Sequence, residues 1–141
     1  MIKLKSDQVM GVTLLSKEEY KEYKNYIPFI KDWWWLRSPG PYYYWAAVAY
    51  DTKHVVCSGI GVSDNNGVRP ALKIENHNLE PGDQFEFGAQ EWTVISNNLA
   101  ICNDIIGKCR FDKVSNNYEK SEIKRYLEGT FLNMEHKTEE I

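Results

Sequence analysis

Three adjacent tryptophans, Trp33 to Trp35, constrain the fold of this 141-residue chain more than any other feature. Successive side chains of a β-strand point to opposite faces, so Trp33 and Trp35 share one face and Trp34 takes the other. Tryptophan is usually mostly buried. We therefore expect the rings to bridge two small cores or to wedge a helix against a sheet, with at least one ring outside the main core. A stacking platform for single-stranded nucleic acid needs interleaved basic residues, and only Lys31 and Arg37 are nearby.

The tryptophan run begins a frame made of two motifs. The first continues as Leu36-Arg37-Ser38-Pro39-Gly40, and the second, from Gly67 to Leu72, reads Gly-Val-Arg-Pro-Ala-Leu. The segment between them, Pro41 to Asn66, follows no simple core period. Catalysis needs a convergent set of titratable groups, and none is evident between the motifs. The arrangement therefore favours recognition over chemistry.

Two arginines of the frame, Arg37 and Arg69, lie close to prolines. A guanidinium in such a place can bind exposed carbonyls or a carboxylate and so hold irregular backbone. We assign a structural role to the frame residues Trp34, Trp35, Arg37 and Arg69. Anion binding by the two arginines is the alternative.

The composition indicates a globular protein, with 43% hydrophobic and 26% charged residues. The length fits a single domain over residues 1–141. A net charge of -3 gives no basic field that would attract nucleic acid or anionic lipid. No run approaches the roughly 18 apolar residues of a membrane span, and the N-terminus lacks the apolar region of a secretory signal. We expect a cytoplasmic protein, or a virion-associated one delivered by another route.

The cysteines and histidines do not form a recognisable reactive or metal-binding pattern. The odd set Cys57, Cys102 and Cys109 contains no C-x-x-C pair, which favours reduced thiols. His54 and Cys57 would face opposite sides of an extended segment, so they could not share a proton. The histidines are too scattered for a zinc site. We predict no metal and no cofactor.

The N-terminal half contains one helix and several short strands. Ser16-Lys17-Glu18-Glu19 matches a capping box, so a helix should begin there and end before Pro28. Strands are expected at Val12 to Leu15, Leu36, Ala46 to Tyr50, Val55 to Val56 and Val68 to Ile74. Turn residues, including Gly59 to Gly61 and Asn65 to Gly67, separate them.

The C-terminal half is predicted to contain a meander followed by a helix. Segments 84–87, 91–95 and 99–102 alternate with a period near two and are separated by turns. Ser121 is the expected N-cap of an amphipathic helix, Gly129 its C′ residue, and the tail from Glu135 to Ile141 should fray. The polar segment Asn76 to Gly82 is the best candidate for a linker.

The four rings Tyr42-Tyr43-Tyr44-Trp45 follow the break Pro39-Gly40-Pro41. Tyrosine and tryptophan supply large, rigid contact area, which recognition loops favour. Two predictions remain possible for this segment: the rings form a binding surface, or they pack in the core. Ser63 to Asn66 could supply oxygen ligands to calcium, but Asn-Gly is foremost a turn signal.

The frame resembles a bacterial and phage domain family of unknown function (DUF6273-like), written W-W-L-R-S-P-G…G-V-R-P-A-L. Members also carry F-G-x-x-x-W-x-V-[IL] and a helix with S-x-[IL]-[KR], which resemble Phe87 to Ile95 and Tyr118 to Leu127. In the usual order these two segments precede the tryptophan motif, whereas here they follow Pro70. The resemblance therefore implies a circular permutation, with its join at residues 76–82.

A wider similarity is to the C-type-lectin-like fold of formylglycine-generating enzymes and of the variable proteins of retroelements. In the variable proteins, the residues between the two motifs bind ligand. Carried over to this chain, the implied ligand-binding positions are Tyr42, Tyr43, Tyr44, Trp45, Tyr50, His54, Ser58, Asp64 and Asn65. Formylglycine-generating chemistry needs a cysteine pair in this half of the fold, and only Cys57 is present.

We therefore predict one α+β domain of C-type-lectin-like fold, with a twisted, mostly antiparallel sheet of short strands, two helices and a long irregular segment. The expected function is non-catalytic binding or display that recognises a protein or glycan, with Tyr42 to Trp45, Tyr50 and His54 on one accessible face. One alternative is a cysteine-dependent oxidase or redox enzyme of the formylglycine-generating type, using Cys57 or the Cys102/Cys109 pair. Another is a structural protein of a phage or mobile element.

Overall fold

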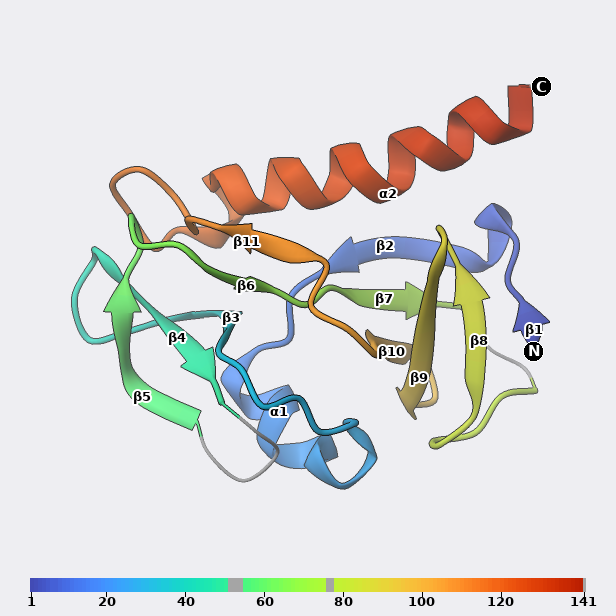
Figure 1. Ribbon diagram of the computed structural model, residues 1–141, viewed down its shortest axis with the longest axis horizontal. Coiled ribbons are helices and arrows are strands. Elements are labelled where there is room, and N and C mark those ends of the chain that lie inside the picture. Colours follow the sequence, from blue (N-terminus) through green and yellow to red (C-terminus); the bar gives the residue numbers. More distant parts are fainter. Residues whose placement is uncertain (51–54, 76–77, 141) are drawn as a thin grey trace.

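The computed structural model describes residues 1–50, 55–75 and 78–140, with side chains except in residues 55–58 and 132–140. The expected α+β class is confirmed, because short strands and two α-helices make up the described chain (Figure 1). The strands are β1 (Ile2–Lys3), β2 (Val9–Thr13), β3 (Trp34–Pro39), β4 (Trp45–Ala49), β5 (Val55–Gly61), β6 (Asn66–Val68), β7 (Ala71–Ile74), β8 (Gln84–Phe87), β9 (Gln90–Ser96), β10 (Leu99–Cys102) and β11 (Gly107–Cys109). The helices are α1 (Lys17–Tyr23) and α2 (Glu122–Glu140), with 3-10 turns at Ser6–Gln8, Lys24–Tyr26 and Tyr118–Lys120.

The strands form two sheets. One is six-stranded, in the order β1-β8-β9-β10-β7-β2, and the other is five-stranded, in the order β11-β6-β3-β4-β5. All neighbouring pairs are antiparallel except β1 with β8 and β3 with β6. The expectation of a mostly antiparallel arrangement is confirmed, whereas the expectation of one sheet is wrong.

The division between the sheets falls at Arg69-Pro70. The sequence predicted one strand from Val68 to Ile74, but β6 ends at Val68 and β7 begins at Ala71 in the other sheet. Proline has no N–H to donate to a ladder, so a strand is readily interrupted there. The carbonyl of Pro70 accepts from the backbone N–H of Cys102 at 2.9 Å, which ties the crossing segment to β10.

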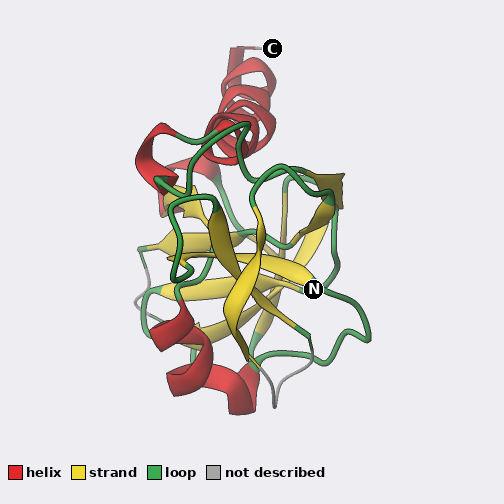
Figure 2. Ribbon diagram, turned by 90° about the vertical axis from the view of Figure 1, so that its left-hand side faces the viewer, coloured by secondary structure: helices red, strands yellow, loops and turns green. Residues whose placement is uncertain are grey.

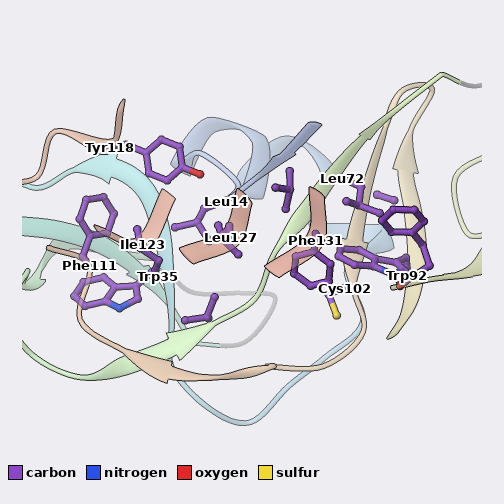
Figure 3. Packing of buried hydrophobic residues seen from close by; sticks show 14 of the residues in the cluster. Leu14, Trp35, Leu72, Trp92, Cys102, Phe111, Tyr118, Ile123, Leu127 and Phe131 are labelled. Carbon is purple, nitrogen blue, oxygen red and sulfur yellow. Dashed lines mark hydrogen bonds between the residues drawn. The ribbon is translucent and has the colours of Figure 1, made fainter. Parts of the chain in front are cut away.

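Both sheets are buried on two faces, which explains the runs of consecutive apolar residues. Trp35 belongs to the cluster that includes Ile123, Leu127 and Phe131 of α2, whereas Trp34 belongs to a second cluster with Tyr20 of α1. The same alternation between clusters holds for Ala46 and Ala47, Val48 and Ala49, Ala71 and Leu72, Val94 and Ile95, and Ala100 and Ile101. Figure 2 shows the strands between the two helices, and Figure 3 shows the three α2 side chains in a row along the first cluster. The prediction that the tryptophans bridge two cores is confirmed.

The segment between the frame motifs is more regular than expected. The strands β4 and β5 pair antiparallel from Trp45 with Gly61 to Ala49 with Val55, with one register shift between Ala46 and Val48, so the expectation of a long irregular segment is wrong. Gly59 was expected in a turn but lies inside β5 with φ +70. A Cβ there would meet the carbonyl oxygen of Ala46 at 2.2 Å, so glycine allows β5 to approach β4.

The helices begin where the sequence predicted and α2 ends later. The Ser16 side chain accepts from the Glu19 backbone and the Glu19 side chain from the Ser16 backbone, which confirms the capping box. Gly129 does not end α2, because the helix continues to Glu140. Phe131, four residues after Leu127, is buried on the same face and offsets the modest cost of an internal glycine. In the described part of the chain, neither helix is long and apolar enough to cross a bilayer.

The meander is confirmed as β8, β9 and β10. The predicted linker lies between β7 and β8, and its residues Asn76 and His77 are outside the described residues. Leu79 of this segment packs against the first core cluster, so the connection is not wholly free of the core.

Candidate functional site: a surface of three loops

Three loops from distant parts of the sequence meet at one end of the five-stranded sheet. They are residues 40–44 before β4, 62–65 after β5, and 110–117 after β11, and we call them the three-loop surface. Figure 1 shows them together at the left-hand end of the molecule. Val62 connects all three, because its N–H donates to Tyr44 O at 2.8 Å and its carbonyl accepts from the backbone N–H of Phe111 at 2.9 Å.

The first loop exposes an aromatic cluster. Tyr42, Tyr43 and Tyr44 are 53%, 70% and 43% exposed, and the half-buried Trp45 begins β4. The rings of Tyr42 and Tyr44 stack at 5.6 Å with an interplanar angle of 13°. Trp45 stands edge-on to both, and Tyr43 stands edge-on to Tyr44. The rings therefore contact one another while remaining accessible. Of the two alternatives left open for this segment, the four rings lie at the surface and do not pack in the core.

Asn116 fixes the backbone of this aromatic turn. Its side-chain Nδ2 donates to the carbonyls of Tyr42 at 2.9 Å and Trp45 at 3.0 Å, and its backbone N–H donates to the carbonyl of Tyr43 at 2.7 Å. A further bond within the turn, from Trp45 N to Tyr42 O, measures 3.0 Å. The turn is thus held in one conformation by a residue more than seventy positions away in the sequence.

Asp112 in turn holds the loop that carries Asn116. Its carboxylate accepts from the backbone N–H groups of Val114 and Ser115 at 3.1 Å and of Glu122 at 3.2 Å. Burial acts to raise the pKa of Asp112, but these backbone donors outweigh it and the pKa is lowered. The ionised carboxylate therefore ties the loop to the N-terminus of α2.

The structure brings together only part of the predicted ligand-binding set. Tyr42, Tyr43, Tyr44, Trp45, Asp64 and Asn65 all lie at the three-loop surface. Tyr50 follows the opposite end of β4, roughly 16 Å away for a five-residue strand. There it stacks on the exposed Trp33 with ring centroids 4.6 Å apart. The expectation of one shared face is therefore wrong for Tyr50, because an extended strand separates the two ends.

Two predicted positions cannot be placed in this arrangement. His54 lies outside the described residues, and Ser58 lies within β5 but its side chain is not described. Sequence reasoning missed Asn116 and Asp112. The stretch Asp112 to Asn117 does carry an Asx-turn pattern, in which an aspartate bonds backbone N–H groups a few residues on. That pattern identifies the turn but not its distant partner.

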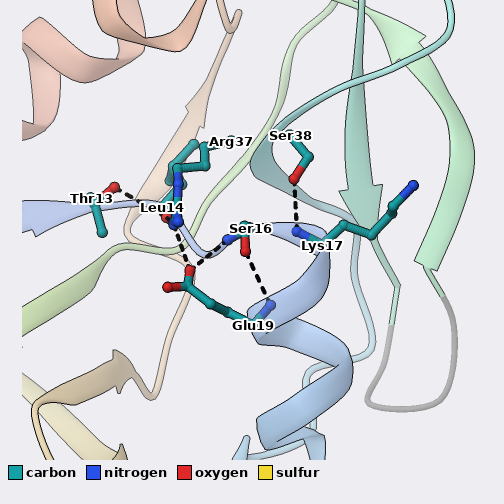
Figure 4. A network of polar contacts seen from close by, with 7 residues as sticks. All are labelled: Thr13, Leu14, Ser16, Lys17, Glu19, Arg37 and Ser38. Carbon is teal, nitrogen blue, oxygen red and sulfur yellow. Dashed lines mark hydrogen bonds and ion pairs between the residues drawn. The ribbon is translucent and has the colours of Figure 1, made fainter.

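The frame residue Arg37 holds the start of α1 (Figure 4). Its guanidinium donates to the carbonyl of Leu14 at 2.7 Å and to the carboxylate of Glu19. Burial acts to raise the pKa of Glu19, but the bond from Arg37 and the capping bonds lower it overall. Ser38 adds a bond, since its Oγ accepts from the Lys17 N–H at 2.8 Å.

The frame residue Arg69 is fully buried between the two sheets. Its Nε donates to the carbonyl of Cys102 at 2.7 Å and its Nη2 to the carbonyl of Pro28 at 2.8 Å. Its guanidinium lies 5.0 Å from the centre of the Trp34 ring. Burial lowers the pKa of Arg69 to about 10, so the side chain still carries its charge at neutral pH.

The described thiols lie in different sheets. Cys102 of β10 and Cys109 of β11 are both free. Burial raises the pKa of Cys102 to about 11, and burial together with Glu122 raises the pKa of Cys109. Both side chains are therefore protonated at neutral pH, which disfavours thiolate chemistry. The side chain of Cys57 is outside the described set.

Among the residues that the structure describes, no three His, Cys, Asp or Glu side chains gather as a metal site would require. A groove of about 400 Å³ adjoins the three-loop surface. Its lining residues are Asn65, Lys108, Cys109, Arg110, Glu122 and Tyr126.

These features define an α+β protein in which two sheets are covered by helices and one sheet end carries a tyrosine-rich loop surface. Residues 8–76, just under half of the chain, match the model of a family described as a domain of unknown function (DUF6273). The matched region contains α1, both frame motifs and the aromatic turn. The expected resemblance to a domain family of unknown function is confirmed for these residues. No curated protein and no solved structure matches the chain.

Proposed function

We propose that the three-loop surface binds a protein or glycan ligand without catalysing a reaction on it. The observation that carries the proposal is the aromatic turn, where three exposed tyrosines sit on a backbone held by Asn116. Single exposed aromatic rings are common on protein surfaces, but clustered ones usually mark an interaction site. A fixed turn also lowers the entropy lost on binding. The polar neighbours Asp64 and Asn65 complete a composition common in recognition loops.

The alternatives receive less support from the geometry. Cysteine-dependent oxidase chemistry needs an accessible thiolate, whereas burial keeps Cys102 and Cys109 protonated. A purely structural role in a phage or mobile element would not require the exposed tyrosines to be held in one conformation. We therefore rank binding above both.

We also propose that the chain is a circularly permuted relative of its family, with a C-type-lectin-like ancestry. The family match ends at residue 76, at the start of the segment inferred as the join. The remaining family-like segments, the meander and the α2 helix, follow it. A chain reordered to begin at Asp83 and linked from Ile141 to Met1 should fold with an unchanged near-ultraviolet circular dichroism spectrum. Loss of that spectrum would count against the permutation.

The binding function is tested by capturing ligands on the immobilised protein and on matched variants. Tyr43→Ala removes the most exposed ring of the aromatic turn, while Tyr26→Ala removes an exposed ring from the 3-10 turn after α1. A ligand of the three-loop surface should be retained by the wild type and Tyr26→Ala and lost from Tyr43→Ala. A glycan array probed with the same three proteins tests the glycan alternative.

Asn116→Ala tests whether the fixed backbone matters. The variant keeps every ring but removes two bonds to the turn. We expect affinity for the captured ligand to fall by about fivefold, in line with roughly 1 kcal/mol for a hydrogen bond. Equal retention by Tyr43→Ala and the wild type would refute the proposed surface.

A further inference from the structure

One acidic side chain of the three-loop surface has no partner. Asp64 in the second loop is exposed, and among the described residues its carboxylate makes no ion pair and accepts no hydrogen bond. Two other acids of this region are occupied, because Asp112 accepts from three backbone N–H groups and Glu122 accepts from Arg110. The Asp64 carboxylate can therefore accept hydrogen bonds from a ligand.

Strand pairing places this carboxylate beside the aromatic turn. The Oδ2 of Asp64 lies 3.3 Å from the position that a Cβ at Gly61 would take. Gly61 is opposite Trp45 in the β4–β5 pair, and opposed residues project to the same face with Cβ positions about 5 Å apart. The carboxylate thus lies on the face of the sheet from which the Trp45 ring projects. Trp45 in turn stands edge-on to the rings of Tyr42 and Tyr44.

The charges around Asp64 favour a cation. Each basic residue near it has an acidic residue of its own: Lys108 with Asp32 at 3.4 Å, Arg110 with Glu122 at 3.0 Å, and Lys113 with its chain neighbour Asp112. Asp112 is ionised, because its backbone donors lower its pKa. Within this described region, Asp64 therefore carries the one negative charge that no neighbouring positive charge balances. A ligand with a positive group is complementary to such a surface.

The rings add a second attraction for the same cation. A positive group held by Asp64 lies next to the half-buried Trp45 and to Tyr44, which is 43% exposed. Aromatic rings attract a cation within about 6 Å of their centres. A guanidinium suits both groups at once, because it is planar, donates two parallel N–H bonds to a carboxylate and stacks on rings. An ammonium group offers only a compact point charge.

We propose that the three-loop surface binds an arginine side chain of a protein ligand. The guanidinium donates to the Asp64 carboxylate and packs against Trp45 and Tyr44, while the aliphatic stem of the arginine adds apolar contact with the exposed tyrosines. This assignment rests on the proposed binding function. It chooses protein over glycan, because the guanidinium is a protein side-chain group.

The experiment titrates the full chain with blocked amino acids and follows backbone amides by NMR. N-acetylarginine amide should shift the signals of Asp64 and Trp45, and the ring current should move the δ-methylene protons of the probe upfield. N-acetylcitrulline amide has nearly the same shape without the charge. It should bind about tenfold more weakly, as expected for the loss of an exposed ion pair and a cation–π contact. N-acetyllysine amide should also bind more weakly than the arginine probe. Glucosamine, a positively charged sugar, provides the glycan arm.

Asp64→Asn is the matched variant, because it keeps the size of an exposed side chain and removes its charge. It should reduce the preference for arginine over citrulline to about threefold, the part that the rings supply. Glu18→Gln removes an exposed charge on α1 and should leave the preference unchanged.

The capture of a ligand that depends on Tyr43 tests the binding function separately, so that function can stand if the arginine assignment fails. The assignment is overturned if N-acetylarginine amide shifts neither Asp64 nor Trp45, or if the citrulline probe binds equally well. It is also overturned if Asp64→Asn leaves the preference unchanged, if Glu18→Gln lowers it as much, or if lysine or glucosamine binds more tightly than arginine.

Discussion

Replacing Arg69 with methionine and with alanine separates the role of its charge from that of its volume. The side chain is fully buried, donates to the carbonyls of Cys102 and Pro28, and lies against the ring of Trp34. Methionine keeps most of the volume but removes the charge and both hydrogen bonds. Alanine removes most of the volume as well as the charge and both hydrogen bonds.

The magnitudes follow from opposing effects. Leaving a buried carbonyl unpaired costs about 1–3 kcal/mol, and both variants leave the Cys102 carbonyl in this state. Both also relieve the cost of a buried charge, about 3 kcal/mol for a pKa lowered from 12.5 to about 10. Because the folded pKa is the lower one, that cost is present in full at neutral pH and is lost only above about pH 10. The alanine cavity adds about 2–5 kcal/mol. Combining these contributions, we expect Arg69→Met to leave the free energy of unfolding unchanged or to raise it by up to about 2 kcal/mol, and Arg69→Ala to lower it by about 0–5 kcal/mol. The alanine variant should therefore be less stable than the methionine variant by the cavity cost of about 2–5 kcal/mol.

The assay is urea unfolding at pH 7, followed by tryptophan fluorescence. The m-value should be the same for the wild type and the variants, so that a shift of the midpoint reports a change in stability. Arg37→Ala is a useful comparison, because its side chain is about one-third exposed and its loss should cost about 1–2 kcal/mol. If Arg69→Ala fails to fold, the methionine variant still gives a measurement. Equal destabilisation by methionine and alanine would show that volume is not the deciding factor, and the reasoning would fail.

Two further sites test the local geometry. Ala89 has φ +63 in the β8–β9 turn, a conformation that glycine adopts more readily than alanine. Ala89→Gly should therefore stabilise the fold by about 0.5–1 kcal/mol and raise the thermal unfolding midpoint. The neighbouring Gly88→Ala should lower it, because φ is +59 and a Cβ would lie 3.1 Å from the Phe131 ring. Asp112→Asn should lower the free energy of unfolding by about 1–2 kcal/mol at neutral pH. Since the folded pKa of Asp112 is lowered from 3.8, this loss should shrink as pH falls below about 4, and a pH-independent difference would contradict the assignment.

Local elements of the fold could be predicted from the sequence because their signals are short-ranged. The capping box at Ser16 and the alternating meander each depend on residues within a few positions of one another. The division of Trp34 and Trp35 between two cores follows from strand geometry alone. None of these required knowledge of which strands pair.

The sequence-based predictions are wrong where contacts between residues far apart in the sequence determine the structure. The stretch from Val68 to Ile74 has the composition of one strand, but the crossing at Arg69 depends on carbonyls of Cys102 and Pro28. Gly129 has the local signal of a helix end, yet burial of Phe131 favours further helix. Local propensity was the weaker effect in both places.

The candidate site shows the same division at a finer level. Its rings could be identified because four consecutive aromatic residues after a proline break are a strong local signal. Its support could not, because Asn116 is separated from the turn by four intervening strands of the same sheet and by the whole meander. This separation of the rings from their support suits the recognition function proposed for the surface. The rings and the residues that hold their backbone are different residues, since Asn116 binds main-chain carbonyls that any side chain would present. Side chains at Tyr42, Tyr43 and Tyr44 can therefore change without loss of the turn, so that new specificities need not alter the fold.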